Sequence, residues 1–308
     1  MQNLPNPAEE RPYDRVKACL EDFKRWREGR KTVAPGDFGQ VFRCKISEAD
    51  WHKLQKDLHI FDNEDHGPFS SCKFSYHTSS SVLVIRYLLT EVHQRPINFL
   101  AQVIRSAIPS LDVDVVQGGP TVTLLHGEAD RESKQADLSI YEEIDGDDKL
   151  KWVLEVGFTE TYDDLLKDVR SWLTGREHEV AFGVLMQITE EPAHHCPLAD
   201  ISDEEFEARG LKSRQDISRS DFVMEGEYGP VSYQGDRWAG QIKEIFWEVW
   251  RLNSQTQEIE LVGEREVIVP ETAASPKIQI GQFLSVAPVG AQISPDWDVF
   301  RTVELAES

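Results

Sequence analysis

The sequence has few cysteines and no long apolar segment. Four cysteines are spread over its 308 residues, and none forms a Cys-x-x-Cys pair, which favours reduced, mostly buried thiols over a disulfide framework. No apolar run approaches the ~20 residues that span a bilayer, so we expect no membrane association. Residues 1–7 lack the basic region and the apolar core of a signal peptide. We therefore expect an intracellular protein, either cytoplasmic or nuclear.

Basic residues are scarce relative to acidic ones. The chain has 33 lysines and arginines against 55 aspartates and glutamates, which gives a formal charge of −22. Affinity for nucleic acid comes largely from neutralising phosphates, so this balance opposes general, charge-driven binding to nucleic acid. A local exception is a basic segment that is either a solvated helix end, with Trp26 packed into the core, or a nucleic-acid-binding patch. Its basic residues are Lys24, Arg25, Arg27, Arg30 and Lys31.

The stretch from Lys134 to Ile188 has the pattern of a strand, an acidic turn, a second strand, a helix and a third, buried strand. Asp137 stands at the head of the first strand, and Glu155 lies 18 residues later inside the second. A strand, a helix and a strand in this order predict a right-handed crossover between parallel strands. Carboxylates on adjacent strands can hold a divalent cation, because hard cations prefer oxygen ligands. The alternative is a strand-end aspartate and a buried glutamate that is paired with an arginine.

Hydrophobic periodicity elsewhere predicts a mixture of helices and strands. Helices are expected over residues 14–27, 51–58, 90–108 and 162–173. Because Pro96 fits best in a first turn, the third helix has a start near Arg95 as its alternative. The acidic segment 190–220 predicts a surface insertion or linker, and residues 270–308 predict a loose, partly packed tail. Strands are expected over residues 73–76, 81–87, 113–117, 121–126, 136–142, 150–156, 180–188, 242–252 and 259–269.

Several short motifs along the chain resemble those of a known superfamily. Lys134 and Asp137 fit a Lys-x-x-Asp strand, and residues 155–161 read Glu-Val-Gly-Phe-Thr-Glu-Thr. The next helix carries a Leu-x-x-Asp-x-x-x-Trp pattern at residues 165–172, and a later strand reads Glu-Val-Trp-Arg at 248–251. This set resembles the PD-(D/E)XK nucleases, the superfamily of many restriction enzymes, and within it a group of fungal proteins with a nuclease-like domain.

The resemblance covers residues 80–190 well and extends to residues 240–270. It implies an α/β fold with a mixed central β-sheet flanked by helices, in a restriction-endonuclease-like arrangement. We therefore expect four parts in the chain. They are an N-terminal helical and strand extension (1–79), the nuclease-like core (80–190), an acidic surface insertion or linker (191–220), and a C-terminal strand pair and tail packed on the core (221–308).

The resemblance also implies a metal site. Asp137 and Glu155 would bind Mg²⁺ or Mn²⁺, and the metal would activate a water molecule that attacks phosphorus. A residue from the helix before the core strands often completes the metal shell in this superfamily. Glu91 or Gln94 would fill that role here, with His93 nearby.

The chain departs from the superfamily at the lysine that normally follows the glutamate by two residues, where it has Gly157. Lys167 on the next helix is the available substitute, but it lies about 160° from the apolar face and should point to solvent. Two functions remain open. One is a Mg²⁺-dependent nuclease that cleaves phosphodiester bonds in DNA, favoured by the carboxylate pair. The other is a catalytically inactive nuclease-like domain that binds a protein or a nucleic acid, favoured by the missing lysine and the charge of −22.

Overall fold

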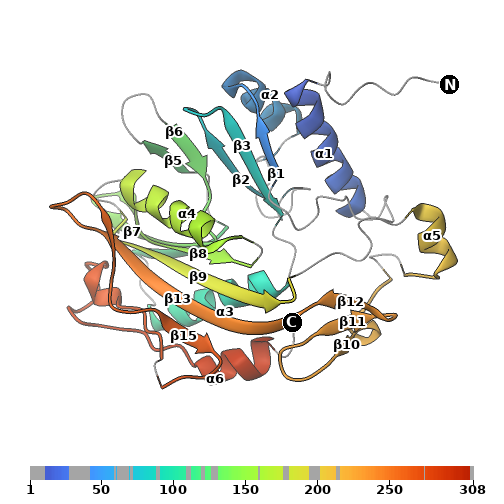
Figure 1. Ribbon diagram of the computed structural model, residues 1–308. Helices are drawn as coiled ribbons and strands as arrows, with labels where there is room; N and C mark the ends of the chain where they lie inside the picture. Colours follow the sequence, from blue (N-terminus) through green and yellow to red (C-terminus); the bar gives the residue numbers. More distant parts are fainter. Residues whose placement is uncertain are drawn as a thin grey trace.

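The protein is a mixed α/β structure, as the sequence predicts, with a large mixed sheet and helices on both of its faces (Figure 1). Among the helices in the described ranges, none combines the length and the apolar character needed to cross a membrane. The computed structural model describes residues 11–27, 42–58, 60, 69, 72–87, 91–108, 112–118, 122–125, 131–158, 160–175, 180–193, 202–212, 216–273 and 275–305.

The elements follow one another in an order that alternates between the sheets. The helices are α1 (Pro12–Arg27), α2 (Glu48–Leu58), α3 (Glu91–Ala107), α4 (Tyr162–Gly175), α5 (Asp203–Ala208) and α6 (Trp297–Val299), with short turns η1 (Arg219–Asp221), η2 (Ile280–Gln282) and η3 (Phe300–Leu305). The strands are β1 (Phe42–Lys45), β2 (Cys72–His77), β3 (Val82–Tyr87), β4 (Val113–Gln117), β5 (Val122–Leu125), β6 (Arg131–Lys134), β7 (Leu138–Ile144), β8 (Asp147–Gly157), β9 (Phe182–Glu191), β10 (Val223–Met224), β11 (Val231–Tyr233), β12 (Asp236–Ala239), β13 (Gln241–Leu252), β14 (Ile259–Leu261) and β15 (Glu266–Val269).

The central sheet has seven strands in the order β14-β13-β9-β8-β7-β4, with β15 also paired to β13. Strands β8 and β9 are parallel and are joined by α4, which confirms the parallel pair predicted from the strand–helix–strand pattern. Strands β7 and β8 form an antiparallel hairpin. Its turn at Asp145 and Gly146 has positive φ angles of 57° and 83°, as an Asp-Gly hairpin turn requires.

Each face of the central sheet buries its own layer. Along β8, Trp152, Leu154 and Val156 pack in the cluster that contains α3, whereas Val153 packs with α4. Successive side chains on a strand point to opposite faces, so Glu155 shares the face of Val153 and points towards α4. Glu155 therefore directs its carboxylate into the layer between the sheet and this helix.

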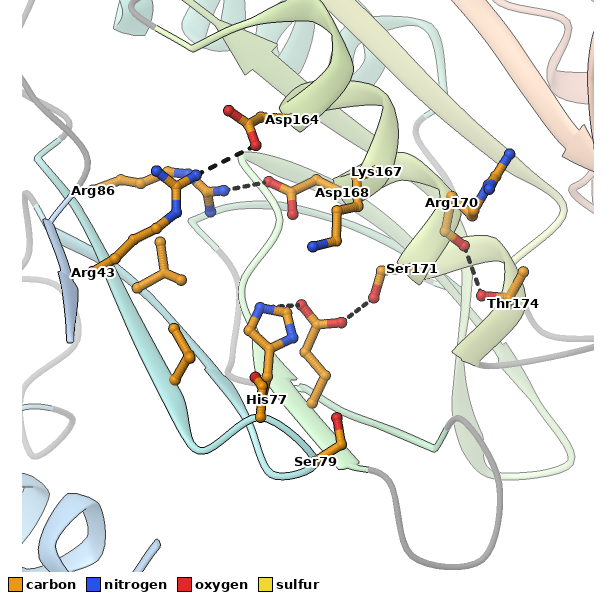
Figure 2. A pocket seen from close by; sticks show the side chains of 14 residues that line it. Arg43, His77, Ser79, Arg86, Asp164, Lys167, Asp168, Arg170, Ser171 and Thr174 are labelled. Atoms are coloured by element: carbon orange, nitrogen blue, oxygen red, sulfur yellow. Dashed lines mark hydrogen bonds and ion pairs between the residues drawn. The ribbon is translucent and has the colours of Figure 1, made fainter. Parts of the chain in front are cut away.

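A second, five-stranded sheet has the order β1-β3-β2-β6-β5 and packs with α1 and α2. The domain boundary expected between residues 79 and 80 falls in the turn of its β2–β3 hairpin, because β2 and β3 pair directly. Strand β6, which the sequence pattern does not predict, pairs with β2 and ends three residues before Asp137. A cavity of about 530 Å³ lies between the β2–β3 hairpin and α4, where the two sheets approach each other (Figure 2).

The C-terminal segment differs from the expected loose tail. Ile280, Phe283, Trp297 and Phe300 are all buried in the core cluster that contains α3. They form two pairs spaced i, i+3, one at η2 and one at α6 and η3, and a single pair in a short turn is too little periodicity to predict burial. Helix α3 also differs from one alternative, since it begins at Glu91 rather than near residue 95 and holds a proline in its interior.

The acidic segment after β9 contains helix α5, and this helix packs on a third small sheet, β10-β11-β12. Phe206 of the helix and Leu211 are buried against Tyr233 of β11. At least this part of the expected insertion or linker is therefore folded.

The substitution Phe300→Ala tests whether the C-terminal segment belongs to the core. Phe300 is fully buried, with its ring centroid 5.3 Å from that of Phe99 on α3. We expect its removal to lower the free energy of unfolding by about 3–5 kcal/mol in urea denaturation. Val289 is 98% exposed in the same segment, so Val289→Ala should change the free energy of unfolding by less than about 0.5 kcal/mol. Equal, small effects of both substitutions would contradict this assignment.

Candidate functional site

The two carboxylates that the sequence singles out are placed together by neighbouring strands. The backbone N–H of Asp137 donates to the carbonyl of Leu154 at 3.1 Å, and its carbonyl accepts from Gly118 at 3.0 Å. These bonds fix Asp137 beside β8, in which Glu155 is the next residue after Leu154. The adjacency predicted for Asp137 and Glu155 is therefore present.

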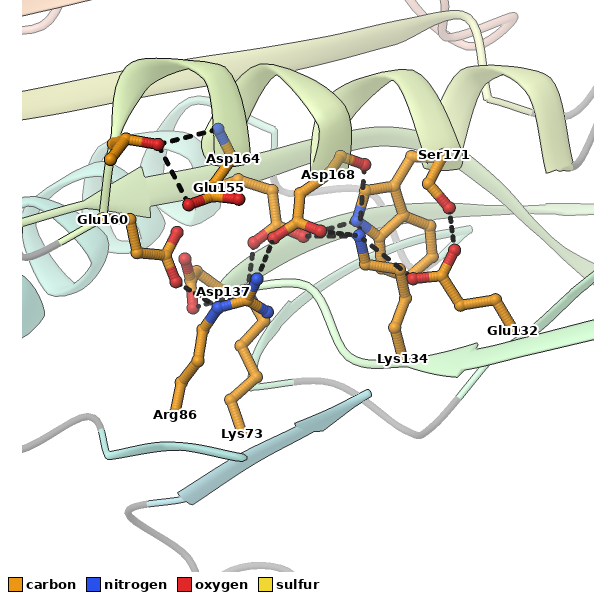
Figure 3. A network of polar contacts seen from close by, with 12 residues as sticks. Lys73, Arg86, Glu132, Lys134, Asp137, Glu155, Glu160, Asp164, Asp168 and Ser171 are labelled. Carbon is orange, nitrogen blue, oxygen red and sulfur yellow. Dashed lines mark hydrogen bonds and ion pairs between the residues drawn. The ribbon is translucent and has the colours of Figure 1, made fainter. Parts of the chain in front are cut away.

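A lysine from the other sheet lies between the two carboxylates (Figure 3). The Lys73 ammonium, on β2, is 3.2 Å from Oδ1 of Asp137 and also donates to Oε2 of Glu155. The exposed fractions are 4% for Lys73, 3% for Asp137 and 1% for Glu155. This is a buried ion triplet that joins the two sheets.

The remaining carboxylate oxygens of the pair are also occupied. Oδ2 of Asp137 accepts from the backbone N–H of Val156 at 2.7 Å and lies 3.6 Å from Nε2 of His93. Oε1 of Glu155 accepts from the indole N–H of Trp172 on α4. All four oxygens of the pair therefore have a partner within the protein.

Further ion pairs surround this triplet and involve α4. The Lys134 ammonium, fully buried, lies 3.0 Å from Oδ1 of Asp168 and 4.0 Å from Oε1 of Glu155. Arg86 of β3 pairs with Asp168 at 2.8 Å and with Glu160. We call the whole set the buried ion network. Its members are Lys73, Arg86, Lys134, Glu132, Asp137, Glu155, Glu160 and Asp168.

The network has five carboxylates and three cationic side chains, and the pKa values of Glu155 and Asp137 are shifted in opposite directions. Burial raises the pKa of Glu155 to about 7, although the charge of Lys73 opposes this shift. Burial acts in the same direction on Asp137, but Lys73, His93 and the Val156 N–H outweigh it and hold the pKa of Asp137 below its usual range. Asp137 is therefore the more acidic member of the pair.

The other two predicted catalytic residues lie away from the pair. Nε2 of Gln94 is 3.4 Å from Nδ1 of His93, and its hydrogen bonds in the described structure do not include either carboxylate. Lys167 is exposed on α4, as its helical phase predicts, and it is not a member of the ion network. His93 is the residue of α3 that reaches the site, since it is buried and its Nε2 lies 3.0 Å from the carbonyl of Val156.

Gly157 stands where the resemblance implies a lysine, and its surroundings favour a residue without a side chain. A Cβ atom at this position would lie 2.7 Å from Cδ2 of Leu165 and 3.2 Å from Oε1 of Gln187. The first distance is shorter than a carbon–carbon contact allows, so the Leu165 side chain would have to shift to admit a larger residue.

The basic segment proposed as a nucleic-acid patch is only partly described. Lys24 and Arg25 are exposed on α1, and Arg27 is the last residue of that helix. Helix α1 packs with α2 and β1, and neither Lys24 nor Arg25 belongs to the ion network. Arg30 and Lys31 lie outside the described residues.

The sequence pattern does not predict Lys73 and Arg86, the cations that the other sheet brings to the site. Lys73 lies in a strand in which all residues from Cys72 to Tyr76 are buried, and Arg86 lies in the adjacent strand β3. A lone lysine inside a short strand pattern was the available signal, but it carries no information about a partner 64 residues away in the chain. As for metals, no group of three or more His, Cys, Asp or Glu side chains in the described part of the chain is arranged to hold one.

Comparison with known proteins adds no family to this description. No family model matches the sequence, and a search of curated proteins gives no significant match. The assignment of a function therefore depends on the geometry of the ion network and of its surroundings.

The substitution Lys73→Met tests whether the pair depends on the ammonium. It leaves Asp137 and Glu155 buried without their shared cation, so we expect the free energy of unfolding at neutral pH to fall by about 3–5 kcal/mol. Lys45 is exposed on β1 of the same sheet, and Lys45→Met should change the free energy of unfolding by less than about 0.5 kcal/mol. A loss below about 1 kcal/mol for Lys73→Met in chemical denaturation would show that the pair is stable without it.

The raised pKa of Glu155 predicts a pH dependence of stability. Between the ordinary pKa of 4.5 and about 7, the folded state holds a proton that the unfolded chain has released. The stability contributed by this proton is present at low pH and is lost as pH rises through about 7. From about pH 5 to about pH 8, the wild type should lose about 2–3 kcal/mol more stability than Glu155→Gln. Denaturation at both pH values measures this, and parallel behaviour of the two proteins would contradict it.

Proposed function

We propose that this protein has a restriction-endonuclease-like fold and acts as a binding module, without cleaving phosphodiester bonds. The module would recognise its partner beside a carboxylate pair that an internal lysine neutralises. The net charge of −22 disfavours nucleic acid as a general partner.

The order of elements around the pair supports the fold. Helix α3 precedes the core strands, Asp137 stands at the start of β7, and Glu155 lies in β8. Helix α4 then leads to β9, which is parallel to β8. This is the succession of helix, aspartate strand, glutamate strand, helix and strand that the resemblance implies.

The position of Lys73 is the observation that supports a binding module without nuclease activity. Its ammonium occupies the space between Asp137 and Glu155 that a divalent cation would need, and the pair is at most 3% exposed. Mg²⁺ requires several oxygen ligands at short distance in near-octahedral geometry. The residues present do not fit Mg²⁺, because their four carboxylate oxygens already accept hydrogen bonds or ion pairs from the protein.

A second candidate function is the Mg²⁺-dependent nuclease, which is favoured by the closeness of the Lys73 ammonium to both carboxylates. The superfamily's lysine holds the nucleophile beside the carboxylates, and Gly157 cannot provide it. Lys73 brings an ammonium to both carboxylates from a different strand. In this candidate, Lys73 would take the role of the missing lysine, and Asp137 and Glu155 would hold the metal, which would activate a water molecule.

Calorimetric titration with Mg²⁺ and Mn²⁺, followed by a cleavage assay on mixed DNA and RNA, separates the two candidates. For the binding module, we expect no saturable metal binding at millimolar concentration and no cleavage by the wild type. The variants Asp137→Asn and Asp137→Ala/Glu155→Ala should give the same result. Circular dichroism and thermal unfolding of each variant would establish that it is folded.

Asp163 provides the matched control for the titration, because it is an exposed carboxylate on α4 outside the ion network. Stoichiometric metal binding that is lost in Asp137→Asn but kept in Asp163→Asn would contradict the binding module. Cleavage lost in the same variant would establish the nuclease.

A further inference from the structure

The cavity between the β2–β3 hairpin and α4 lies directly beside the ion network, and Arg86, Glu132 and Asp168 belong to both (Figure 2). Its volume of about 530 Å³ is in the range of sites that hold one small ligand. The carboxylate pair is not part of its lining, so a ligand here would contact the outer side of the network and not the pair.

Each acidic side chain that lines this cavity already lies beside a cationic side chain. Asp168 is paired with Arg86 and Lys134. Asp164 accepts a hydrogen bond from the Thr161 hydroxyl at 3.0 Å and lies 3.4 Å from a guanidinium nitrogen of Arg43. Glu132, the third, accepts from the hydroxyl of Ser171 and lies 3.8 Å from the Lys134 ammonium.

Lys167 takes part in none of these ion pairs. Among the described residues, no carboxylate forms an ion pair with it, although the chain carries 22 more negative than positive charges. Its ammonium points into the cavity towards His77 (Figure 2). Burial lowers the pKa of His77, and the charges of Lys134 and Lys167 act in the same direction, whereas Glu132, whose Oε1 lies 3.6 Å from Nε2 of His77, opposes the shift.

Further donors surround Lys167. The Arg43 side chain is 48% exposed, and its contact with Asp164 is longer than an ordinary N–H···O bond, which leaves guanidinium N–H groups for a ligand. The hydroxyls of Ser79 and Ser80 line the cavity from the exposed β2–β3 turn. Ammonium, guanidinium and hydroxyl donors around one small space are the groups that bind phosphate oxygens.

We infer that this cavity binds a phosphate monoester, with Lys167 and Arg43 as the charged donors. The inference rests on the proposed function, since it names the ligand of the binding module. A compact dianion needs only these local charges, whereas a polyanion such as nucleic acid would also meet the repulsion of the whole acidic chain. A small phosphorylated molecule is therefore favoured over a nucleic-acid strand.

Calorimetric titration without divalent metal tests the inference. The probes are inorganic phosphate, adenosine 5′-monophosphate, adenosine, and a short DNA oligonucleotide without a terminal phosphate. We expect one saturable site for phosphate and for the monophosphate, and no binding of adenosine or of the oligonucleotide. Lys167→Met should weaken monophosphate binding by about tenfold or more, because one charge-assisted contact is lost.

Lys243→Met is the control, because Lys243 is exposed on β13 and does not line the cavity. It should bind the monophosphate as the wild type does. The inference is overturned if neither phosphate nor the monophosphate binds, if Lys167→Met binds as tightly as wild type, or if only the oligonucleotide binds. Because these titrations contain no metal, their failure is distinct from that of the proposed function, which the metal titration and the cleavage assay decide.

Discussion

The ammonium of Lys73 neutralises carboxylates that belong to another sheet. Burying an ionised side chain costs several kcal/mol unless the charge is paired. Glu155 of β8 can therefore be buried only if a cation lies beside it or if its carboxyl group is protonated. Residue 157 of the central sheet is a glycine, and the two ammonium groups near the pair, those of Lys73 and Lys134, come from β2 and β6 of the five-stranded sheet. The five-stranded sheet is therefore a required part of the core of this protein.

This dependence also determines how the two sheets are joined. The contacts of Lys73 with the pair close loops of 64 and 82 residues, and β6 carries the chain from the five-stranded sheet straight to Asp137. Contacts between residues so far apart in the sequence form only after the intervening chain has been ordered, so forming this interface costs conformational entropy. Five carboxylates against three cations leave the network acidic, and the raised pKa of Glu155 relieves part of that excess.

Local patterns in the sequence were enough for much of the central sheet. The hairpin of β7 and β8, the helix after it and the parallel strand β9 follow from periodicity and turn residues, and so does the meeting of Asp137 with Glu155. Lys73 could not be foreseen, because pairing between distant charges leaves no periodic trace. The burial of the C-terminal segment was not predicted for a related reason, since Trp297 and Phe300 lie in short helical turns in which no periodic pattern can develop. The alternative of a buried glutamate paired with an arginine differs from the structure in its partner, because Lys73 contacts Glu155.

The packing around Gly157 restricts how this chain could change. A side chain there would meet the side-chain ends of Leu165 and Gln187, so a larger residue requires both neighbours to move. The three positions therefore form one packing unit, in which a change at residue 157 is coupled to the conformations of Leu165 on α4 and Gln187 on β9.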